Sequence, residues 1–423
     1  MDQTRSLCFL FALCACAFAD EQSDAELLEK VRIHMVENLH RLPNYTCLQT
    51  IERSQRRAPS RRQELIDTVR LEVALVNGKE LFAWPGERTF QEKDINQMVT
   101  GGAIGNGSFA IHAKSVFESR VPRFTFIGEQ MRDGRKTLRW DFEVARIRSG
   151  YLIRVGPREA IVGYHGSFWV DADTHDLIRL EVVPENIPPE LQLAAASDSM
   201  NYMRARIGES TFLLPQSSEL RMTDSNNSDS VNRTSFSKCR QYTGESVLSF
   251  GDPADLDKPT QIIRQVDIPS GLLLETATET PIDSTNTAVG DPVTAIVTRT
   301  MKKDGVELAP KGAVLHGRVT LLRRQNLDRT AFVIGIRFRE MEAPGIHASL
   351  NLELQDVMAS GNIVMVPGAL RTGSRWATGT AMPKLDQEVF GSVFFVRGNE
   401  FRLPRGLHML WRTAAVKPED PPQ

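Results

Sequence analysis

Apolar residues recur at helical spacing near the start of the chain. The segment Ser23 to Glu26 forms a capping box, which is typical of a helix N-terminus. The apolar positions that follow fall on one stripe, and Pro43 ends the pattern. We therefore expect one amphipathic helix, whose apolar stripe another element must cover. The stripe consists of Leu27, Leu28, Val31, Met35, Leu39 and Leu42.

After this helix the pattern changes to a period of two, which indicates strands with one buried face. The dipeptides Asn77-Gly78 and Asp133-Gly134 are favoured in tight hairpin turns. A glycine-rich stretch and an expected short helix, Ser108 to Glu118, interrupt the strands. Residues 184–199 are rich in proline and alanine and predict a loop or short helix. The clearest alternation is that of Leu65, Val69, Leu71, Val73 and Leu75.

A polar, proline-containing segment at residues 251–268 predicts a linker between two domains. Beyond it, Phe332, Ile334, Ile336 and Phe338 alternate with other residues, as expected for antiparallel sheet. We therefore expect an N-terminal domain at residues 20–250 and an all-β domain at residues 269–415. The charged, proline-rich residues 416–423 predict a disordered tail.

The composition is that of a folded protein. The chain has 423 residues, of which 41% are hydrophobic and 25% charged. These values exclude a wholly disordered chain, a collagen and a coiled coil. The formal charge is only -2, so nothing indicates a dedicated nucleic-acid binder.

The first nineteen residues resemble a secretory signal peptide. Arg5 and Ser6 precede thirteen apolar or small residues, Leu7 to Ala19, which end in a small-x-small motif. This run is shorter than the roughly 20 residues of a membrane span, and we expect no transmembrane span in the mature chain. The alternatives are a lipoprotein signal, with a lipid anchor at Cys16, and a buried N-terminal helix.

The mature chain keeps two of the five cysteines, Cys47 and Cys239. Two thiols in an oxidising compartment suggest one disulfide, and two buried free thiols are the alternative. Neither cysteine belongs to a CxxC motif, so a redox-active pair is not expected.

Residues 22–250 resemble the periplasmic lipoprotein-carrier (lipoprotein-sorting) superfamily. The matching features are the leading helix, the strand meander, the turn within Phe168 to Leu177, and the segment Phe212 to Pro215. The resemblance implies a mainly β chain with an α+β N-terminal unit, in which one helix packs against an antiparallel curved half-barrel. A smaller β-barrel or β-sandwich domain would follow. The segment Leu42 to Cys47 also resembles uncharacterised secreted acidobacterial proteins.

Residues 271–319 are similar to the C-terminal β-domain of TrbI-like conjugation and secretion-channel proteins. The matching positions are Pro281 to Ser284, Gly290-Asp291 and Pro310 to Gly312. An upstream membrane helix and a long proline-rich stalk, which that family has, are missing. The resemblance therefore implies a β-domain and a location in the cell envelope, but no channel.

Motifs for enzymatic chemistry are absent from the sequence. The glycines of residues 102–108 have the spacing of a phosphate loop, but Ser108 stands where lysine is required, so a surface loop is the better interpretation. Asp171, Asp173 and Asp176 lack the further ligands of a calcium loop and predict a hairpin turn. The eight histidines show no paired metal-ligand spacing. We therefore expect no catalytic residues, metal or cofactor.

Two sets of residues are candidates for binding. Five arginines between the first two expected strands form either a solvated hairpin loop or a contact surface for anionic lipid or envelope polymer: Arg53, Arg56, Arg57, Arg61 and Arg62. Tryptophans in the strand patterns are expected in the core. Three of them are candidates for lining an apolar pocket: Trp84, Trp140 and Trp169.

The sequence thus predicts an exported, non-enzymatic protein of the periplasm or outer membrane. It would bind an apolar ligand, such as an acyl chain or a lipoprotein, or an envelope protein. Two alternatives stay open, a structural adaptor in an envelope or secretion assembly and an unrecognised hydrolase. A large apolar cavity would favour the first role, and a solid core with an exposed edge strand would favour the adaptor.

Overall fold

The structure is a computed structural model that describes residues 7–87, 89–92, 95–99, 109–156, 158–242, 264–326, 330–358, 363–364 and 392–415. The described chain is mostly antiparallel β structure with a leading helix, as the sequence predicts. Trp376, the glycine-rich loop at residues 101–108, most of the predicted linker and the predicted tail lie outside these ranges.

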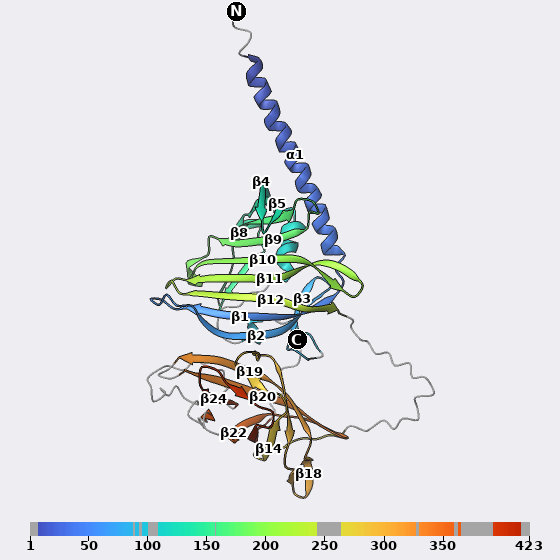
Figure 1. The fold of residues 1–423 in the computed structure, drawn as a ribbon, viewed down its shortest axis with the longest axis vertical. Coiled ribbons are helices and arrows are strands. Elements are labelled where there is room, and N and C mark those ends of the chain that lie inside the picture. The colour runs from blue at the N-terminus through green and yellow to red at the C-terminus, as the bar shows by residue number, and fades with distance from the viewer. Residues whose placement is uncertain are drawn as a thin grey trace, which may run out of the picture. The chain divides into compact units, whose positions relative to one another are not determined.

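The chain divides into two compact units (Figure 1). Unit 1 comprises Met1–Glu64, Glu72–Phe82 and Phe90–Thr243, and unit 2 comprises Leu65–Leu71, Ala83–Thr89 and Gly244–Gln423. Since residues 243–263 are not described, the predicted domain limits at 250 and 268 stay a prediction.

The leading helix α1 (Leu7–His40) is longer than expected. It does not begin at the capping box of Ser23 but also includes residues 7–22, where leucine and alanine favour a helix. The predicted stripe is confirmed at Val31 and Met35, which are buried. Within the described residues, we find no helix with the length and apolarity needed to cross a bilayer.

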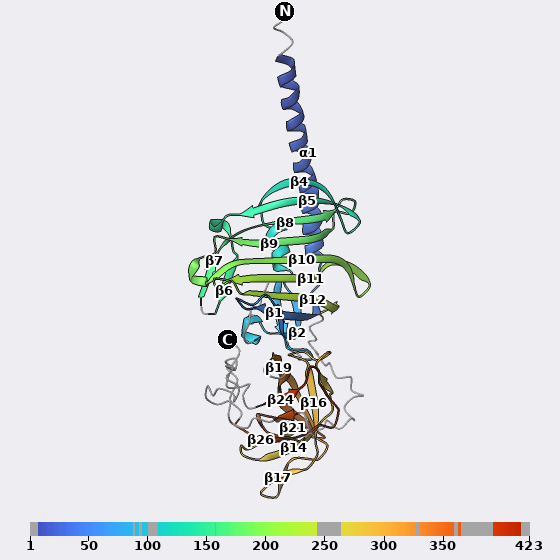
Figure 2. The ribbon, with the colours of Figure 1, turned by 60° about the vertical axis from the view of Figure 1, so that its left-hand side comes forward.

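A ten-stranded curved sheet makes up most of unit 1, in the order β3-β2-β1-β12-β11-β10-β9-β8-β5-β4. Figure 2 shows the strands from β4 to β2 following one another across this half-barrel. Short helices and a separate hairpin, β6-β7, complete the unit. Its elements after α1 are β1 (Tyr45–Arg56), β2 (Glu64–Val76), β3 (Lys79–Ala83), α2 (Ile95–Met98), α3 (Ile111–Phe117), β4 (Arg123–Arg132), β5 (Arg135–Val144), β6 (Leu152–Val155), β7 (Arg158–Ile161), β8 (Gly163–Asp171), β9 (Leu177–Glu185), β10 (Leu193–Ile207), β11 (Ser210–Asp224) and β12 (Asp229–Gln241).

One local prediction is only partly right. The stretch at 184–199 was expected to be a loop or short helix, and residues 186–192 do form a loop with the 3-10 turn Pro189–Leu191, but the chain then enters β10 at Leu193. Alanine has little strand propensity. Pairing with β11 along the whole strand and with β9 at Asp198 to Asn201 overrides that local preference.

The inner face of the sheet packs on α1 and α3. Val31 and Met35 of α1 and Val116 and Phe117 of α3 belong to one core cluster with the inward-facing residues of the sheet. Those sheet residues include Trp140, Phe142, Phe168, Leu180, Val182 and Met200. The part of the interior between the sheet, α1 and α3 that this cluster fills is therefore solid and apolar.

The predicted disulfide is confirmed. Cys47 on β1 is bonded to Cys239 on β12, with their Cα atoms 4.1 Å apart and a sequence separation of 192. The two strands are neighbours, and their register shifts between Thr46 and Leu48. The bond thus joins the first and last strands of unit 1 at an irregularity in their pairing.

Unit 2 is an all-β unit built on a second ten-stranded sheet. Its path is β13-β21-β20-β19-β16-β14-β26-β22, and β24 pairs with β20 and β23. The alternation at Phe332 to Phe338 lies in its longest strand, as expected. Its strands are β13 (Arg264–Gln265), β14 (Leu273–Thr278), β15 (Ile282–Asp283), β16 (Pro292–Val297), β17 (Met301–Lys303), β18 (Val306–Ala309), β19 (Val314–Asn326), β20 (Thr330–Ala343), β21 (Ile346–Ser349), β22 (Leu352–Met358), β23 (Ile363–Val364), β24 (Val393–Arg397), β25 (Arg402–Leu403) and β26 (His408–Thr413).

Candidate functional site

The interior of unit 1 also has a polar part, beside α3. Six ionisable residues from separate segments gather there, and we call them the buried polar cluster. Asp198 lies on β10 directly opposite Val182 of the core, so its side chain points into the half-barrel. The cluster consists of Tyr45 (β1), Glu80 (β3), His112 (α3), Tyr151 (before β6), Asp198 and Tyr202 (both β10).

Contacts with α3 hold this cluster together. His112 Nε2 lies 3.4 Å from Asp198 Oδ2, and the two side chains are only 9% and 5% exposed. The ring of Tyr151 packs edge-on against His112 at 5.5 Å. Glu80 Oε1 accepts hydrogen bonds from the backbone N–H groups of Ala110 and Ile111, at 2.9 and 3.3 Å. Two carboxylates from different strands therefore anchor the start of α3.

Three polar atoms of this cluster lack a partner. Among the described residues, the hydroxyl groups of Tyr45 and Tyr202 and Asp198 Oδ1 are buried without a hydrogen bond. Leaving one such group unpaired costs roughly 1–3 kcal/mol. A polar group that entered here would therefore gain hydrogen bonds at no expense to existing ones.

The tyrosines of the cluster stay protonated. Burial raises the pKa of the Tyr45 hydroxyl well above its usual value, and the nearby Glu80 adds to the effect. Burial, followed by the charge of Asp198, raises the pKa of both Tyr151 and Tyr202. All three hydroxyls therefore remain hydrogen-bond donors at any physiological pH.

A small hollow lies where α1 ends. Its volume is about 260 Å³, and its lining includes Leu42, Pro43, Asn77, Lys114 and Glu118. Ligand pockets commonly have about 300–1,000 Å³ and mostly apolar walls. This hollow is therefore too small and too polar to hold an acyl chain in the present arrangement.

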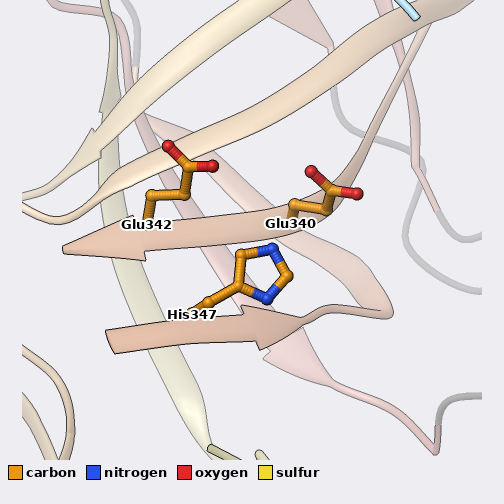
Figure 3. A group of neighbouring side chains, drawn as sticks. All are labelled: Glu340, Glu342 and His347. Carbon is orange, nitrogen blue, oxygen red and sulfur yellow. The ribbon is translucent and has the colours of Figure 1, made fainter. Parts of the chain in front are cut away.

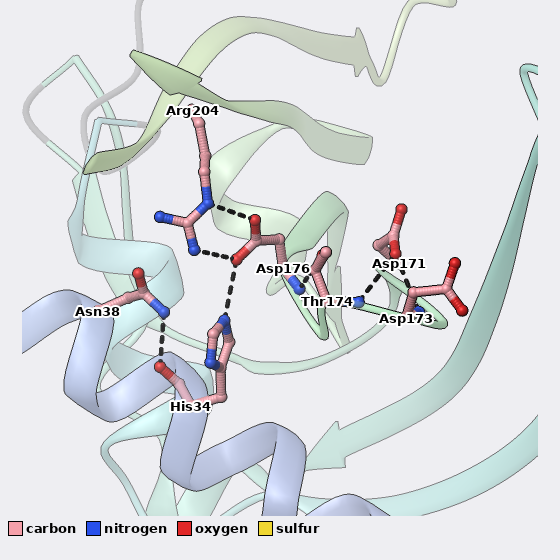
Figure 4. A network of polar contacts seen from close by, with 7 residues as sticks. All are labelled: His34, Asn38, Asp171, Asp173, Thr174, Asp176 and Arg204. Carbon is pink, nitrogen blue, oxygen red and sulfur yellow. Dashed lines mark hydrogen bonds and ion pairs between the residues drawn. The ribbon is translucent and has the colours of Figure 1, made fainter. Parts of the chain in front are cut away.

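A polar network attaches α1 to the sheet (Figure 4). His34 Nε2 lies 2.9 Å from Asp176 Oδ1, and Arg204 donates to both carboxylate oxygens at 2.6 Å. Asp171 forms the predicted hairpin turn by accepting the N–H groups of Asp173 and Thr174. Asp171 thus stabilises the turn, and Asp176 connects it to α1.

We expect Asp176→Asn to destabilise unit 1 in a pH-dependent way. Burial raises the pKa of Asp176, but the hydrogen bonds from Arg204 and His34 outweigh it, so the pKa is lowered. A lowered pKa means that the ionised carboxylate stabilises the fold above its unfolded pKa of about 4, and that this stability is lost as the pH falls through the folded value. Urea unfolding should show a loss of roughly 1–2 kcal/mol at pH 7.

At pH 3 the difference between Asp176→Asn and the wild type should be smaller than at pH 7, because pH 3 lies below the unfolded pKa of about 4 and protonation there favours the unfolded wild type. Asp173→Asn is the matched control, since it lies in the same turn outside the ion pair. An unchanged difference at pH 3 would contradict the role of the charge.

The five arginines do not form one surface. Arg53 is buried at 2% exposure. Arg56 donates to Asp229 Oδ2 at 2.7 Å and to the carbonyl oxygens of Ser60 and Asn227. Arg57, Arg61 and Arg62 are exposed in the loop between β1 and β2. The predicted contact with an anionic surface stays a prediction, and it concerns these three exposed residues.

The three tryptophans lie in different surroundings. Trp140 is buried in the core, stacked on Phe168 at 5.3 Å. Trp169 pairs with Arg139 and faces the opposite side of the sheet, with the guanidinium of Arg132 4.9 Å from its ring. Trp84 lies in a segment assigned to unit 2. A role for Trp84, Trp140 and Trp169 in ligand binding stays a prediction, with each residue in a separate environment.

Unit 2 brings together a group that sequence reasoning missed. Glu340, Glu342 and His347 offer ligand atoms within 4.8 Å of one another (Figure 3). The turn at Pro344-Gly345 places His347 opposite Glu342. The sequence signal for this group was a Glu-x-Glu pattern followed by a turn and a histidine. The pair His112 and Asp198 was also missed, because the two residues lie far apart in sequence and no short motif links them.

Comparisons with known proteins give only distant likenesses. No family model and no curated protein matches the chain. Among solved structures, a DUF1329 family protein from Desulfovibrio piger has 11% identity and a TM-score of 0.28, and covers 53% of this chain and 98% of its own. A LolA superfamily protein from Nitrosomonas europaea has 9% identity and a TM-score of 0.26, and covers 51% of this chain and 93% of its own.

A putative outer membrane lipoprotein-sorting protein domain from Vibrio parahaemolyticus has 14% identity and a TM-score of 0.29, and covers 52% of this chain and 95% of its own. Two of the three structures thus carry the name of the group that residues 22–250 resemble. At these TM-scores the likenesses carry no argument about function. The resemblances to TrbI-like domains and to acidobacterial secreted proteins find no support in them and stay predictions.

Proposed function

We propose that this is an exported, non-enzymatic binding protein of the cell envelope. Unit 1 would hold an amphiphilic ligand, such as an acyl chain with a polar end, inside its half-barrel. The supporting observation is the two-part interior, with an apolar core beside buried polar atoms that lack partners. The Cys47–Cys239 disulfide supports export, since such bonds persist in oxidising compartments.

For an acyl chain to enter the half-barrel, α3 would have to leave the position that it occupies. The helix has only seven residues, and isolated helices of this length are unstable in water. Its side chains fill the space that an acyl chain would need, as the packing of Phe117 on Phe168 at 5.0 Å indicates. Ligand binding would therefore exchange the apolar contacts of α3 for those of the ligand.

We expect brominated stearic acid to bind the full chain saturably and to quench its tryptophan fluorescence. Bromine quenches at short range, so the quenched residue should be Trp140, which lies in the core of the half-barrel. Trp140→Phe should remove the quenching. In the wild type, unlabelled stearate should compete with the brominated acid and reverse the quenching. Trp411→Phe, at an equally buried tryptophan of unit 2, is the control that should leave it unchanged.

Tyr202→Phe gives a second readout in the same experiment. The hydroxyl has no partner among the described residues, so its removal should leave stability unchanged or raise it by up to about 1 kcal/mol. Affinity for stearate should fall several-fold if the hydroxyl binds the polar end of the ligand. Tyr242→Phe, at the end of β12, is the matched control. Absence of saturable binding, or quenching that survives Trp140→Phe, would overturn the proposal.

A structural adaptor is the second candidate, and the edge strand β4 favours it. Strand β4 pairs with β5 and ends the sheet, and it has no buried residue. It exposes Ile127 and Met131, at 44% and 70%. An open edge of this kind can accept a strand from another protein. Binding of a partner protein that is lost in Ile127→Pro, with stearate binding retained, would favour this role.

A further inference from the structure

Three neighbouring strands of unit 2 place two histidines and two glutamates on one face. Glu340 and Glu342 are two residues apart on β20, so their side chains share a face of the sheet. In register, His316 of β19 lies opposite Glu340, and His347 of β21 lies opposite Glu342. All four side chains therefore point to the same side.

The distances bring three of these side chains close enough to share an ion. Ligand atoms of Glu340, Glu342 and His347 lie within 4.8 Å of one another. His316 Nε2 lies 3.5 Å from Glu342 Oε2 but outside this group of three, so its side chain would have to turn toward them to become a fourth ligand. Figure 3 shows the imidazole of His347 reaching toward the two glutamates from the neighbouring strand.

The carboxylates on this face lack the arginine or lysine partner that some other strand carboxylates of unit 2 have. Glu275 pairs with Arg299, and Glu307 pairs with Lys302. For Glu340 and Glu342, the contacts found within the described residues come from histidine, with no lysine or arginine. Two like charges on one sheet face repel each other, and a bound cation would remove that repulsion.

We propose that His316, Glu340, Glu342 and His347 form a zinc site. Two imidazole nitrogens and two carboxylate oxygens are a ligand set that Zn²⁺ accepts in tetrahedral geometry, at about 2.0–2.2 Å from the metal. Imidazole ligands favour Zn²⁺ over Mg²⁺ and Ca²⁺, which prefer oxygen. Bound zinc would join β19, β20 and β21 across one face. The site is independent of the ligand proposed for unit 1.

Isothermal titration of the full chain, purified without a polyhistidine tag, tests the site. We expect saturable binding of one Zn²⁺, and no comparable binding of Mg²⁺. His316→Ala, His347→Ala and the double variant Glu340→Gln/Glu342→Gln should each weaken zinc binding by at least about tenfold, since changing even an outer partner of a metal ligand costs about that much. The Gln variants keep the size of the side chains, and a melting temperature without zinc close to that of the wild type would show that they fold.

His408→Ala is the matched control, because His408 is an exposed histidine of unit 2 outside the site. It should leave zinc binding unchanged. Zinc should also raise the melting temperature of the wild type but not that of His347→Ala, because a ligand stabilises only the state that binds it. Lack of saturable zinc binding, or equal affinity in the wild type and His347→Ala, would overturn the proposal.

Discussion

Removal of the Cys47–Cys239 bond should lower the free energy of unfolding by about 2–5 kcal/mol. The bond closes a loop with a sequence separation of 192 residues, so it removes much of the freedom of the unfolded chain. The chain-entropy model gives roughly 5 kcal/mol for a loop of this size, which places the expected loss at the upper end. Cys47 is 1% exposed, so replacement by serine would also bury a new hydroxyl.

Calorimetry of the Cys47→Ala/Cys239→Ala variant measures this loss, because alanine adds no buried polar group. The wild type after reduction should melt at a temperature close to that of the variant. Peptide mapping without reductant should recover the two cysteines in one linked fragment. If the variant had the same melting temperature as the oxidised wild type, the bond would add no stability.

Trp140→Ala should cost about 3–5 kcal/mol of stability in unit 1. Trp140 is 1% exposed and sits between Phe168, at 5.3 Å, and Phe126, at 4.9 Å. Its removal leaves a cavity that β strands held by ladder hydrogen bonds on both sides cannot close, and it also removes the aromatic contacts. Urea unfolding followed by circular dichroism measures the loss.

Trp169→Ala is the control for this variant. Trp169 lies on the neighbouring strand β8 but faces away from the core, between the guanidinium groups of Arg132 and Arg139. Trp169 is also buried, at 6% exposure, but arginine side chains rather than packed aromatic rings cover it, so its replacement should cost less. Equal losses in the two variants would mean that the apolar interior is not the main source of stability in unit 1.

The sequence predicts the fold well where local pattern and tertiary packing agree. The stripe with Val31 and Met35 forms the buried side of α1, and the alternation from Leu65 to Leu75 forms β2. Asn77 and Asp133 adopt positive φ angles of 51° and 50° in the turns predicted for them. In each case the residues that form the element also contain the sequence pattern that predicts it.

The candidate sites could not be predicted because they depend on register between distant segments. Asp198 meets His112 because β10 pairs with β9 where it does, and His316 meets Glu342 through pairing of β19 with β20. Arg53 looked like a surface residue beside Arg56 and Arg57, but inward alternation along β1 buries it. Residues 193–199 were expected outside the sheet, because their place in it depends on pairing with β9 and β11.

The position of β1 in the sheet has a consequence for biosynthesis. Its neighbours are β2 and β12, and β12 ends at Gln241. The first strand therefore lacks one partner until the ribosome has made nearly two hundred further residues, and contacts so distant in sequence form slowly. A nascent chain of this kind should complete its sheet later than one whose early strands pair locally.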